Sequence, residues 1–147
     1  MDIVSTILNA AKVAGVSGTL LLGICSHESN SFTMNYSPHD HGSPSYGVCQ
    51  VKLESARQLG FKGSPYELMD PKKNALWAAR YLKYQESRYG NNLCKITAAY
   101  NSGSYVESKK KPGKPKNLKY VRLVQKRLPD VFKNRLNCNS EFWIEND

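Results

Sequence analysis

The sequence predicts a mainly α-helical fold: a single helical domain with a long loop or small β region at about residues 30–52. Apolar residues recur at helical spacing through most of the chain. Residues 30–46 instead are rich in Ser, Asn, Pro, His, Asp and Gly and have no helical period. The length of 147 residues, 40% of them hydrophobic, suits one compact core, so we expect one domain over residues 1–147.

Two helices are predicted before the loop. The first follows Asp2, a suitable N-cap, and Gly15 ends its apolar pattern. Ser17 can cap the second, whose wide apolar stripe carries few charges, so we expect it to be the buried central helix. The residues of this stripe are Leu20, Leu21, Ile24 and Cys25.

Three helix starts are predicted after the loop. Residues 53–59 have the apolar spacing of a short helix that ends at Gly60. Ser64 and Glu67 have the spacing of a capping box, with a proline at the first helical position between them. Asp70 and the proline after it begin an alanine-rich helix.

The remaining apolar patterns predict helices to near the end of the chain. The alanine-rich helix should stop near Gly90, and another apolar face covers residues 93–100. A loop rich in Lys, Pro and Gly spans residues 109–116. A last major helix is expected over residues 118–128, and residues 131–136 can add a short one.

The net charge of +9 is concentrated in one segment. No acidic residue occurs between Ser108 and Pro129, whereas the rest of the chain has as many acidic as basic residues. Such a segment could attract nucleic acid, anionic lipid or a polyanionic cell-wall polymer, and charge alone does not choose among them. The cationic residues are Lys109, Lys110, Lys111, Lys114, Lys116, Lys119, Arg122, Lys126 and Arg127.

No apolar run is long enough to span a membrane, and the most apolar stretch is Val13–Cys25. The chain opens with Met1 and Asp2 rather than with basic residues, so we predict no signal peptide. Synthesis in a reducing cytoplasm is therefore expected, with the cysteines as free thiols.

Glu28 is the candidate catalytic residue. If the second helix continues this far, Glu28 lies four residues after Ile24 and seven after Leu21, on the apolar face. Burial there disfavours the ionised carboxyl and suits a general acid that holds its proton near neutral pH. The alternative is a glutamate at a helix end that turns out to solvent.

Short motifs between about Leu20 and Val124 occur in the order typical of one family. They are Glu28-Ser29 with Phe32 and Ser37, Gly47-Val48-Cys49-Gln50, Asp70-Pro71 with Asn74, Tyr81 and Leu82, Ala99-Tyr100-Asn101-Ser102-Gly103, and Tyr120-Val121. In these residues the chain resembles the soluble lytic transglycosylases of glycoside hydrolase family 23. Val48 and Cys49 stand where the family usually has Leu and Met, and Ala79 where it has Gly. The resemblance implies an α+β lysozyme-like fold.

The resemblance also implies a reaction. The bond cleaved would be the β-1,4 bond between N-acetylmuramic acid and N-acetylglucosamine in peptidoglycan, with formation of 1,6-anhydro ends. Glu28 would be the single general acid and base, and the acetamido group of the substrate would stabilise the developing cation, so no second carboxylate is needed. We expect neither a cofactor nor a metal ion.

Five further residues are implied to bind substrate. Ser37 would hydrogen-bond near the acid or the sugar ring, and Tyr120 would donate to the catalytic carboxyl. The amides of Gln50 and Asn101 can pair with N-acetyl groups, and Tyr100 offers a ring face and a hydroxyl to a sugar. The structural alternatives are a turn-forming serine, loop-stabilising amides and core tyrosines.

Other interpretations of the same region remain open. If Asp40 positioned a water molecule, as aspartates do in goose-type lysozymes, the protein would be a muramidase, an inverting hydrolase. His39 and His41 lack the further ligands of a zinc site. Cys25 and Cys49 both fall near the proposed site and could approach each other, but buried free thiols are the simpler interpretation.

A different class of function is a non-catalytic module that binds cell wall or nucleic acid through the basic segment Lys109–Arg127. Prolines and a glycine interrupt its lysines and no nucleic-acid motif accompanies it, so we expect no nucleic-acid partner. The expected partners are peptidoglycan glycan strands, and the segment could contact anionic envelope polymers. We expect a monomer without stable membrane insertion, made in the cytoplasm of a bacteriophage-infected bacterium and acting as an endolysin on the cell wall or periplasm.

Overall fold

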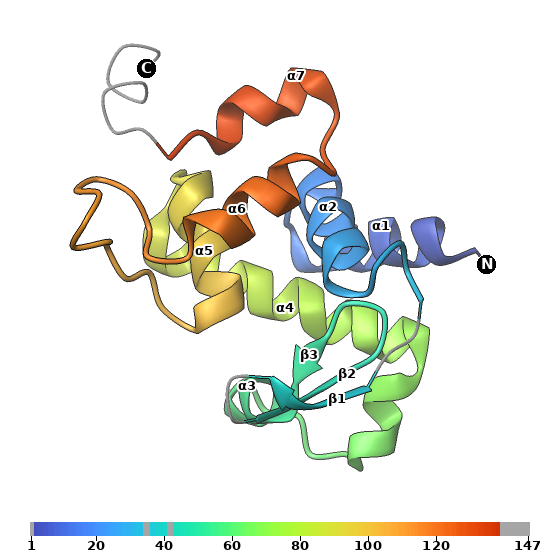
Figure 1. The fold of residues 1–147 in the computed structure, drawn as a ribbon. Helices are drawn as coiled ribbons and strands as arrows, with labels where there is room; N and C mark the ends of the chain where they lie inside the picture. Colours follow the sequence, from blue (N-terminus) through green and yellow to red (C-terminus); the bar gives the residue numbers. More distant parts are fainter. Residues whose placement is uncertain (1, 34–35, 41–42, 139–147) are drawn as a thin grey trace. The chain divides into compact units, whose positions relative to one another are not determined.

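The computed structural model describes residues 2–33, 36–40 and 43–138 (Figure 1). Contacts between Cα atoms divide the chain into two compact units, an N-terminal unit, Met1–Tyr84, and a C-terminal unit, Gln85–Asp147. Helices dominate both units and a small sheet lies in the first, which confirms the predicted mainly α-helical class. Among the described helices, none has the length and apolarity that a membrane crossing requires.

The N-terminal unit begins with two packed helices, α1 (Ile3–Ala14) and α2 (Gly18–Glu28). Both start where the sequence predicts. The Oδ1 atom of Asp2 accepts a hydrogen bond from the backbone N–H of Ser5, and Ser17 Oγ accepts one from the N–H of Leu20. Gly15 ends α1 in the left-handed conformation. The apolar stripe of α2 is buried, as expected for a central helix.

A three-stranded antiparallel sheet follows α2, in the region where the sequence left a loop or a β region open. Its strands are β1 (Tyr36–Asp40), β2 (Ser43–Tyr46) and β3 (Val51–Lys52), in the order β1-β2-β3. Tyr36 pairs with Tyr46 across the first two strands, and their ring centroids are 5.1 Å apart. In Figure 1 the sheet lies against the short helix α3 (Leu53–Gln58).

The capping box at Ser64 and the proline at position 71 each begin a helix, and the two helices follow one another directly. Glu67 Oε2 accepts a hydrogen bond from the N–H of Ser64, so the predicted capping box is present. The helix that it begins, η1 (Pro65–Met69), is a 3₁₀ helix. It is short because Asp70 precedes a proline and is therefore extended, with ψ at 123°. The long helix α4 (Pro71–Tyr89) begins there and ends directly before Gly90, near the predicted stop.

The C-terminal unit contains α5 (Leu93–Ser102), α6 (Leu118–Gln125), α7 (Asp130–Lys133) and η2 (Asn134–Leu136), after the last residues of α4. Helices α5 and α6 pack together, and η2 also contacts α5. The predicted helix over residues 118–128 is shorter than expected, because a turn replaces its last residues before Pro129.

The four cysteines form two disulfides, Cys25–Cys49 and Cys94–Cys138. The expectation of free thiols is therefore wrong. The partners are 24 and 44 residues apart in the sequence, so their approach depends on tertiary structure that spacing does not reveal. Each disulfide joins a buried helix to a segment distant in the sequence.

Candidate active site

Glu28 is the last residue of α2, and it is half-buried. The residue after it, Ser29, is fully buried and ends the helix: its N–H and its Oγ both donate to the carbonyl oxygen of Cys25, at 3.1 and 3.0 Å. The backbone that carries the carboxyl of Glu28 is therefore fixed from its C-terminal side.

The chain turns sharply just beyond this serine. Asn30, Ser31 and Phe32 have φ values of 47°, 65° and 69°. These values lie in the left-handed region of backbone conformation, which residues other than glycine and asparagine rarely adopt. The N–H of Ser31 is held by the carbonyl oxygen of Ser26, at 2.8 Å. Such conformations persist where the surrounding structure imposes them, and they cluster at functional sites.

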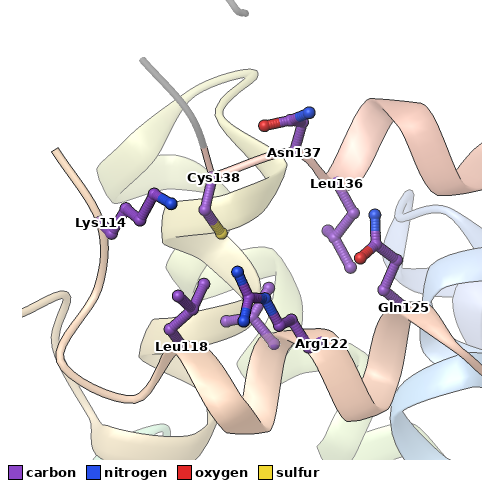
Figure 2. Close-up of a pocket in the computed structure, with 8 residues that line it drawn as sticks. Lys114, Leu118, Arg122, Gln125, Leu136, Asn137 and Cys138 are labelled. Atoms are coloured by element: carbon purple, nitrogen blue, oxygen red, sulfur yellow. The ribbon is translucent and has the colours of Figure 1, made fainter. Parts of the chain in front are cut away.

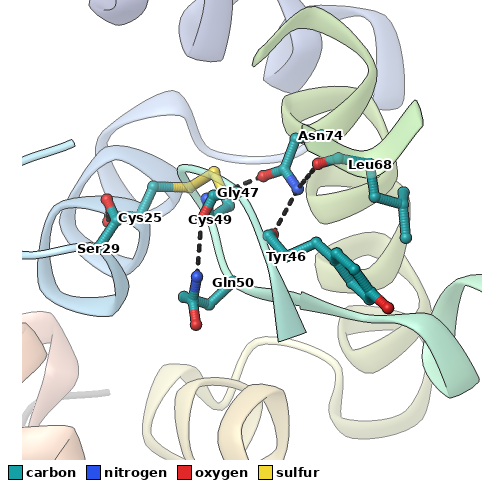
Figure 3. Close-up of a disulfide and its surroundings, with 8 residues drawn as sticks. All are labelled: Cys25, Ser29, Tyr46, Gly47, Cys49, Gln50, Leu68 and Asn74. Carbon is teal, nitrogen blue, oxygen red and sulfur yellow. Dashed lines mark hydrogen bonds between the residues drawn. A yellow bond between two sulfur atoms is a disulfide. The ribbon is translucent and has the colours of Figure 1, made fainter. Parts of the chain in front are cut away.

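The Cys25–Cys49 disulfide links the end of α2 to the turn Gly47–Gln50 (Figure 3). Both cysteines are fully buried. Cys25 precedes Glu28 by three residues and Cys49 directly precedes Gln50, so one covalent bond connects the two sequence motifs.

The turn Gly47–Gln50 requires glycine at its first position. Gly47 has φ at 77°, and a Cβ atom there would lie 2.5 Å from Nδ2 of Asn74 and 2.7 Å from the carbonyl oxygen of Leu68. Gln50 closes the turn, because its N–H and its Nε2 both donate to the carbonyl oxygen of Gly47, each at 3.0 Å. The side chain of Asn74 and the carbonyl oxygen of Leu68 therefore approach the turn more closely than a residue with a Cβ atom at position 47 would allow.

Asn74, in the first turn of α4, holds this turn in place (Figure 3). Its side chain is fully buried and forms three hydrogen bonds. Oδ1 accepts from the N–H of Cys49 at 2.8 Å, while Nδ2 donates to the carbonyl oxygens of Tyr46 at 2.6 Å and Leu68 at 2.7 Å. The sequence motif that includes Asn74 is thus the anchor of the motif that includes Gln50.

The structure brings Ser37 and Gln50 together. Ser37 Oγ, on β1, donates to Oε1 of Gln50 at 2.7 Å. The amide of Gln50 is thus held through its oxygen by β1 and through its nitrogen by its own turn. These are the contacts of the structural alternative, a loop-stabilising amide, and contact of either side chain with substrate stays a prediction.

The other three predicted site residues lie in the C-terminal unit. Tyr100 and Asn101 are in the last turn of α5, and Tyr120 is in α6; both tyrosines are buried. Oδ1 of Asn101 accepts a hydrogen bond from Nδ2 of Asn117 at 3.0 Å, which ties α5 to the start of α6. The expected hydrogen bond from Tyr120 to the catalytic carboxyl stays a prediction.

Two polar residues that sequence reasoning missed support the end of α5. Nε2 of Gln85, which is fully buried, donates to the carbonyl oxygens of Ala99 and Gly103, at 3.3 and 3.0 Å. Arg88 donates to the carbonyl oxygen of Gly103 at 2.6 Å and to Oε1 of Gln85 at 2.9 Å. The sequence contains one signal for this role: Gln85 lies three residues after Leu82, which places a polar side chain on the apolar face of the alanine-rich helix.

The candidates for the alternative chemistries are only partly described. Asp40 ends β1, but its side chain and that of His39 lie outside the described part of the structure, and His41 lies outside the described residues. Among the residues that are described, no group of three or more His, Cys, Asp or Glu could hold a metal ion.

Comparison with known proteins identifies the fold. The lytic transglycosylase Slt of Pseudomonas aeruginosa, solved as an inactive mutant with glutamine in place of a glutamate, has a TM-score of 0.58 and 20% identity over 90% of this chain and 22% of that one. The 70 kDa soluble lytic transglycosylase of Escherichia coli has a TM-score of 0.58 and 21% identity over 94% of this chain and 21% of that one. A complex of the 70 kDa soluble lytic transglycosylase with bulgecin A has a TM-score of 0.57 and 20% identity over 94% of this chain and 21% of that one.

This chain therefore spans about a fifth of the length of those enzymes, and at this identity the likeness concerns the fold. No curated protein sequence matches the chain. The family model described as "Transglycosylase SLT domain" matches residues 5–121, most of the chain and every motif from Glu28 to Val121. The predicted family resemblance is confirmed: the chain belongs to the transglycosylase SLT domain family.

Proposed function

We propose that this protein is a peptidoglycan lytic transglycosylase with Glu28 as its single general acid and base. The observation that carries the proposal is the position of this glutamate, at the end of α2 in a chain of the SLT family. The buried Ser29 and the Cys25–Cys49 disulfide fix the backbone on both sides of Glu28. A catalytic carboxyl needs such support to keep its geometry.

The reaction requires two proton transfers at one place. Glu28 first donates its proton to the oxygen that links N-acetylmuramic acid to N-acetylglucosamine, and that bond breaks while the acetamido oxygen stabilises C1 of the muramoyl unit. The carboxylate of Glu28 then takes the proton of the C6 hydroxyl of the muramoyl unit, while the oxygen of that hydroxyl forms a bond to C1. The glutamate is regenerated, a 1,6-anhydro end forms and no water is consumed. Attack within one sugar unit profits from high effective molarity.

The remaining site residues would position the sugar. We propose that Ser37 and Gln50, which are hydrogen-bonded to each other, border the acid within the N-terminal unit. The family resemblance also implies polar and ring contacts to the sugar from Tyr100, Asn101 and Tyr120. The matched P. aeruginosa enzyme is inactive when glutamine replaces a glutamate, which supports dependence on one carboxyl.

Glu28→Gln tests the assignment, because the amide keeps the shape of the side chain but cannot transfer the proton. We expect turnover of purified peptidoglycan to fall by about 10²- to 10⁴-fold, the usual contribution of a general acid or base. Glu54→Gln, an exposed glutamate on α3, is the matched control and should retain activity. Far-ultraviolet circular dichroism and urea unfolding check that both variants are folded. Turnover of Glu28→Gln near that of the wild type would refute the proposal.

Mass spectrometry of the digest tests the reaction type. Anhydro ends are lighter by one water than reducing ends. Reducing ends would show hydrolysis and would direct attention to Asp40 as the residue that positions water.

We also propose that the protein acts at the cell wall or in the periplasm, as a phage endolysin would. Its two disulfides support this, because disulfides form and persist in oxidising compartments and are rare in the cytoplasm. Alkylation of cysteines in fractionated cells should find them paired in the envelope fraction. Active enzyme with all four thiols free in that fraction would contradict the proposal.

A further inference from the structure

The basic segment Lys109–Arg127 lines nearly all of a groove within the C-terminal unit. The groove has a volume of about 450 Å³ and lies between the loop that precedes α6 and α6 itself. None of its ten lining residues is acidic. Six of them are cationic and define the cationic groove: Lys110, Lys111, Lys116, Lys119, Arg122 and Lys126.

The loop side of the cationic groove is held by its own backbone. The N–H of Ser108 donates to the carbonyl oxygen of Lys114, and the N–H of Lys116 donates to the carbonyl oxygen of Val106, each at 2.7 Å. Ser108 Oγ also accepts from the N–H of Lys111 at 3.1 Å. The lysines of the loop therefore lie on a turn that is already ordered before a ligand binds. This reduces the conformational entropy that the loop loses on binding.

The helix side presents its cations along one face. Lys119 and Arg122 on α6 and Lys126, the residue that caps its C-terminal end, are spaced i, i+3 and i+7. They therefore follow one side of the helix over about 10 Å, at 1.5 Å per residue. The buried residues Tyr120 and Val124 occupy other positions of the helix. Like charges gathered in this way repel one another, and a bound anion relieves that repulsion.

The cationic groove lies next to a smaller pocket, and the two share the lining residues Leu118 and Arg122. In Figure 2, Lys114 from the loop and Arg122 from α6 extend toward this pocket from two sides. Asn137 adds an amide to its lining. The cationic surface thus has depth and length, which suits a chain with repeated charges better than a single ion.

The chemistry of the lining distinguishes among polyanions. Single-stranded nucleic acid is usually held by aromatic side chains that stack on its bases, and no aromatic residue lines the groove. Duplex DNA is read by protein elements that project into its own grooves, whereas this surface is concave. Five of the six cations are lysines, which bind phosphate groups as point charges and do not require the planar, two-bonded geometry that arginine uses. Pro115, Leu118 and Leu123 add apolar surface for carbon atoms between phosphates.

We propose that the cationic groove binds a flexible phosphodiester polymer without bases, of the polyol-phosphate kind found in cell envelopes. The choice of an envelope polymer rests on the proposed function, while the cationic groove itself does not include Glu28. Binding would keep the enzyme on its target surface between cleavage events, and it would weaken as salt increases.

Fluorescence anisotropy with a labelled glycerol-phosphate polymer tests this proposal on the full chain at several salt concentrations. The groove variant carries Lys119→Gln, Arg122→Gln and Lys126→Gln. The control variant carries Lys12→Gln, Lys62→Gln and Lys72→Gln, which remove the same charge from the N-terminal unit. With about 0.7 counterions released per contact, as for single-stranded nucleic acid, the groove variant should lose up to about 10²-fold in affinity at 0.1 M salt. Its slope of log K against log salt should become less steep by about 2.

The expected result is this loss in the groove variant, with the control variant within a factor of about two of the wild type. Equal losses in both variants would overturn the proposal, because binding would then follow net charge alone. Tighter binding of a single-stranded DNA of equal charge, or binding to phosphatidylglycerol vesicles but not to the polymer, would also overturn it. The measurement needs no turnover, so its result is independent of whether Glu28 is catalytic.

Discussion

Removal of the Cys25–Cys49 disulfide should destabilise the protein and weaken its catalysis. The bond closes a loop between residues 24 apart in the sequence. With the chain-entropy relation, a loop of that length corresponds to about 3.5 kcal/mol of stability at 25 °C. The double substitution Cys25→Ser and Cys49→Ser should therefore lower the free energy of unfolding by about this amount, which still leaves a typical domain folded.

The second disulfide provides a matched control. Cys94–Cys138 closes a loop of 44 residues, so its removal with serine should lower the free energy of unfolding by about 4 kcal/mol. The two variants should thus be similar in stability. Only Cys25–Cys49 joins the end of α2 to the turn that contains Gln50. Its loss should therefore lower kcat more than the loss of Cys94–Cys138 does.

Urea unfolding followed by circular dichroism gives the two free energies, and peptidoglycan turnover under fully folded conditions gives the two rates. A loss below about 1 kcal/mol for the first variant would show that the crosslink restrains little. Equal effects of the two variants on kcat would refute the connection between Cys25–Cys49 and the site.

Two further changes test other parts of the N-terminal unit. Asn74→Ala should lower the free energy of unfolding by about 3 kcal/mol, measured in urea, because it leaves two buried and one part-buried backbone group without their partner. A loss below about 1 kcal/mol would contradict this. The pKa of Glu67 is lowered by its hydrogen bond with Lys73 and by the N–H of Ser64, so the folded state favours the carboxylate. The stability that this gives is present above the ordinary carboxyl pKa and is lost as the pH falls through the lowered one. The Tm difference between wild type and Glu67→Gln should therefore shrink in acid, and a difference independent of pH would contradict the assignment.

Local signals in the sequence predicted the fold where neighbouring residues determine it. Asp2 and Ser17 cap their helices as expected, since a cap depends on contacts within one turn. The sheet was left open because its pairing joins residues such as Tyr36 and Tyr46 across a segment rich in proline and polar residues. The capping box also predicted the start of η1. Its short 3₁₀ geometry was not predicted, and it follows from the start of the next helix, α4, at Pro71, two residues after η1 ends.

The candidate site was predicted in its residues more than in its contacts. The order of motifs identified Gln50 and Asn74. The hydrogen bond that joins their two motifs runs from the N–H of Cys49 to Oδ1 of Asn74, and it depends on a tertiary approach across 25 residues. The sequence does not predict the Cys25–Cys49 disulfide, because spacing does not distinguish paired cysteines from buried thiols.

The carboxamide of Asn74 makes the two motifs mutually dependent. It is the one side chain of its size that offers a donor pair and an acceptor together: aspartate has no donor, and leucine has neither. Gly47 must in turn stay without a side chain, since the carboxamide occupies the space a methyl group would need. A smaller residue at position 74 alone should therefore not rescue a substituted Gly47, because the φ of 77° and the carbonyl oxygen of Leu68, 2.7 Å from the added Cβ atom, would remain.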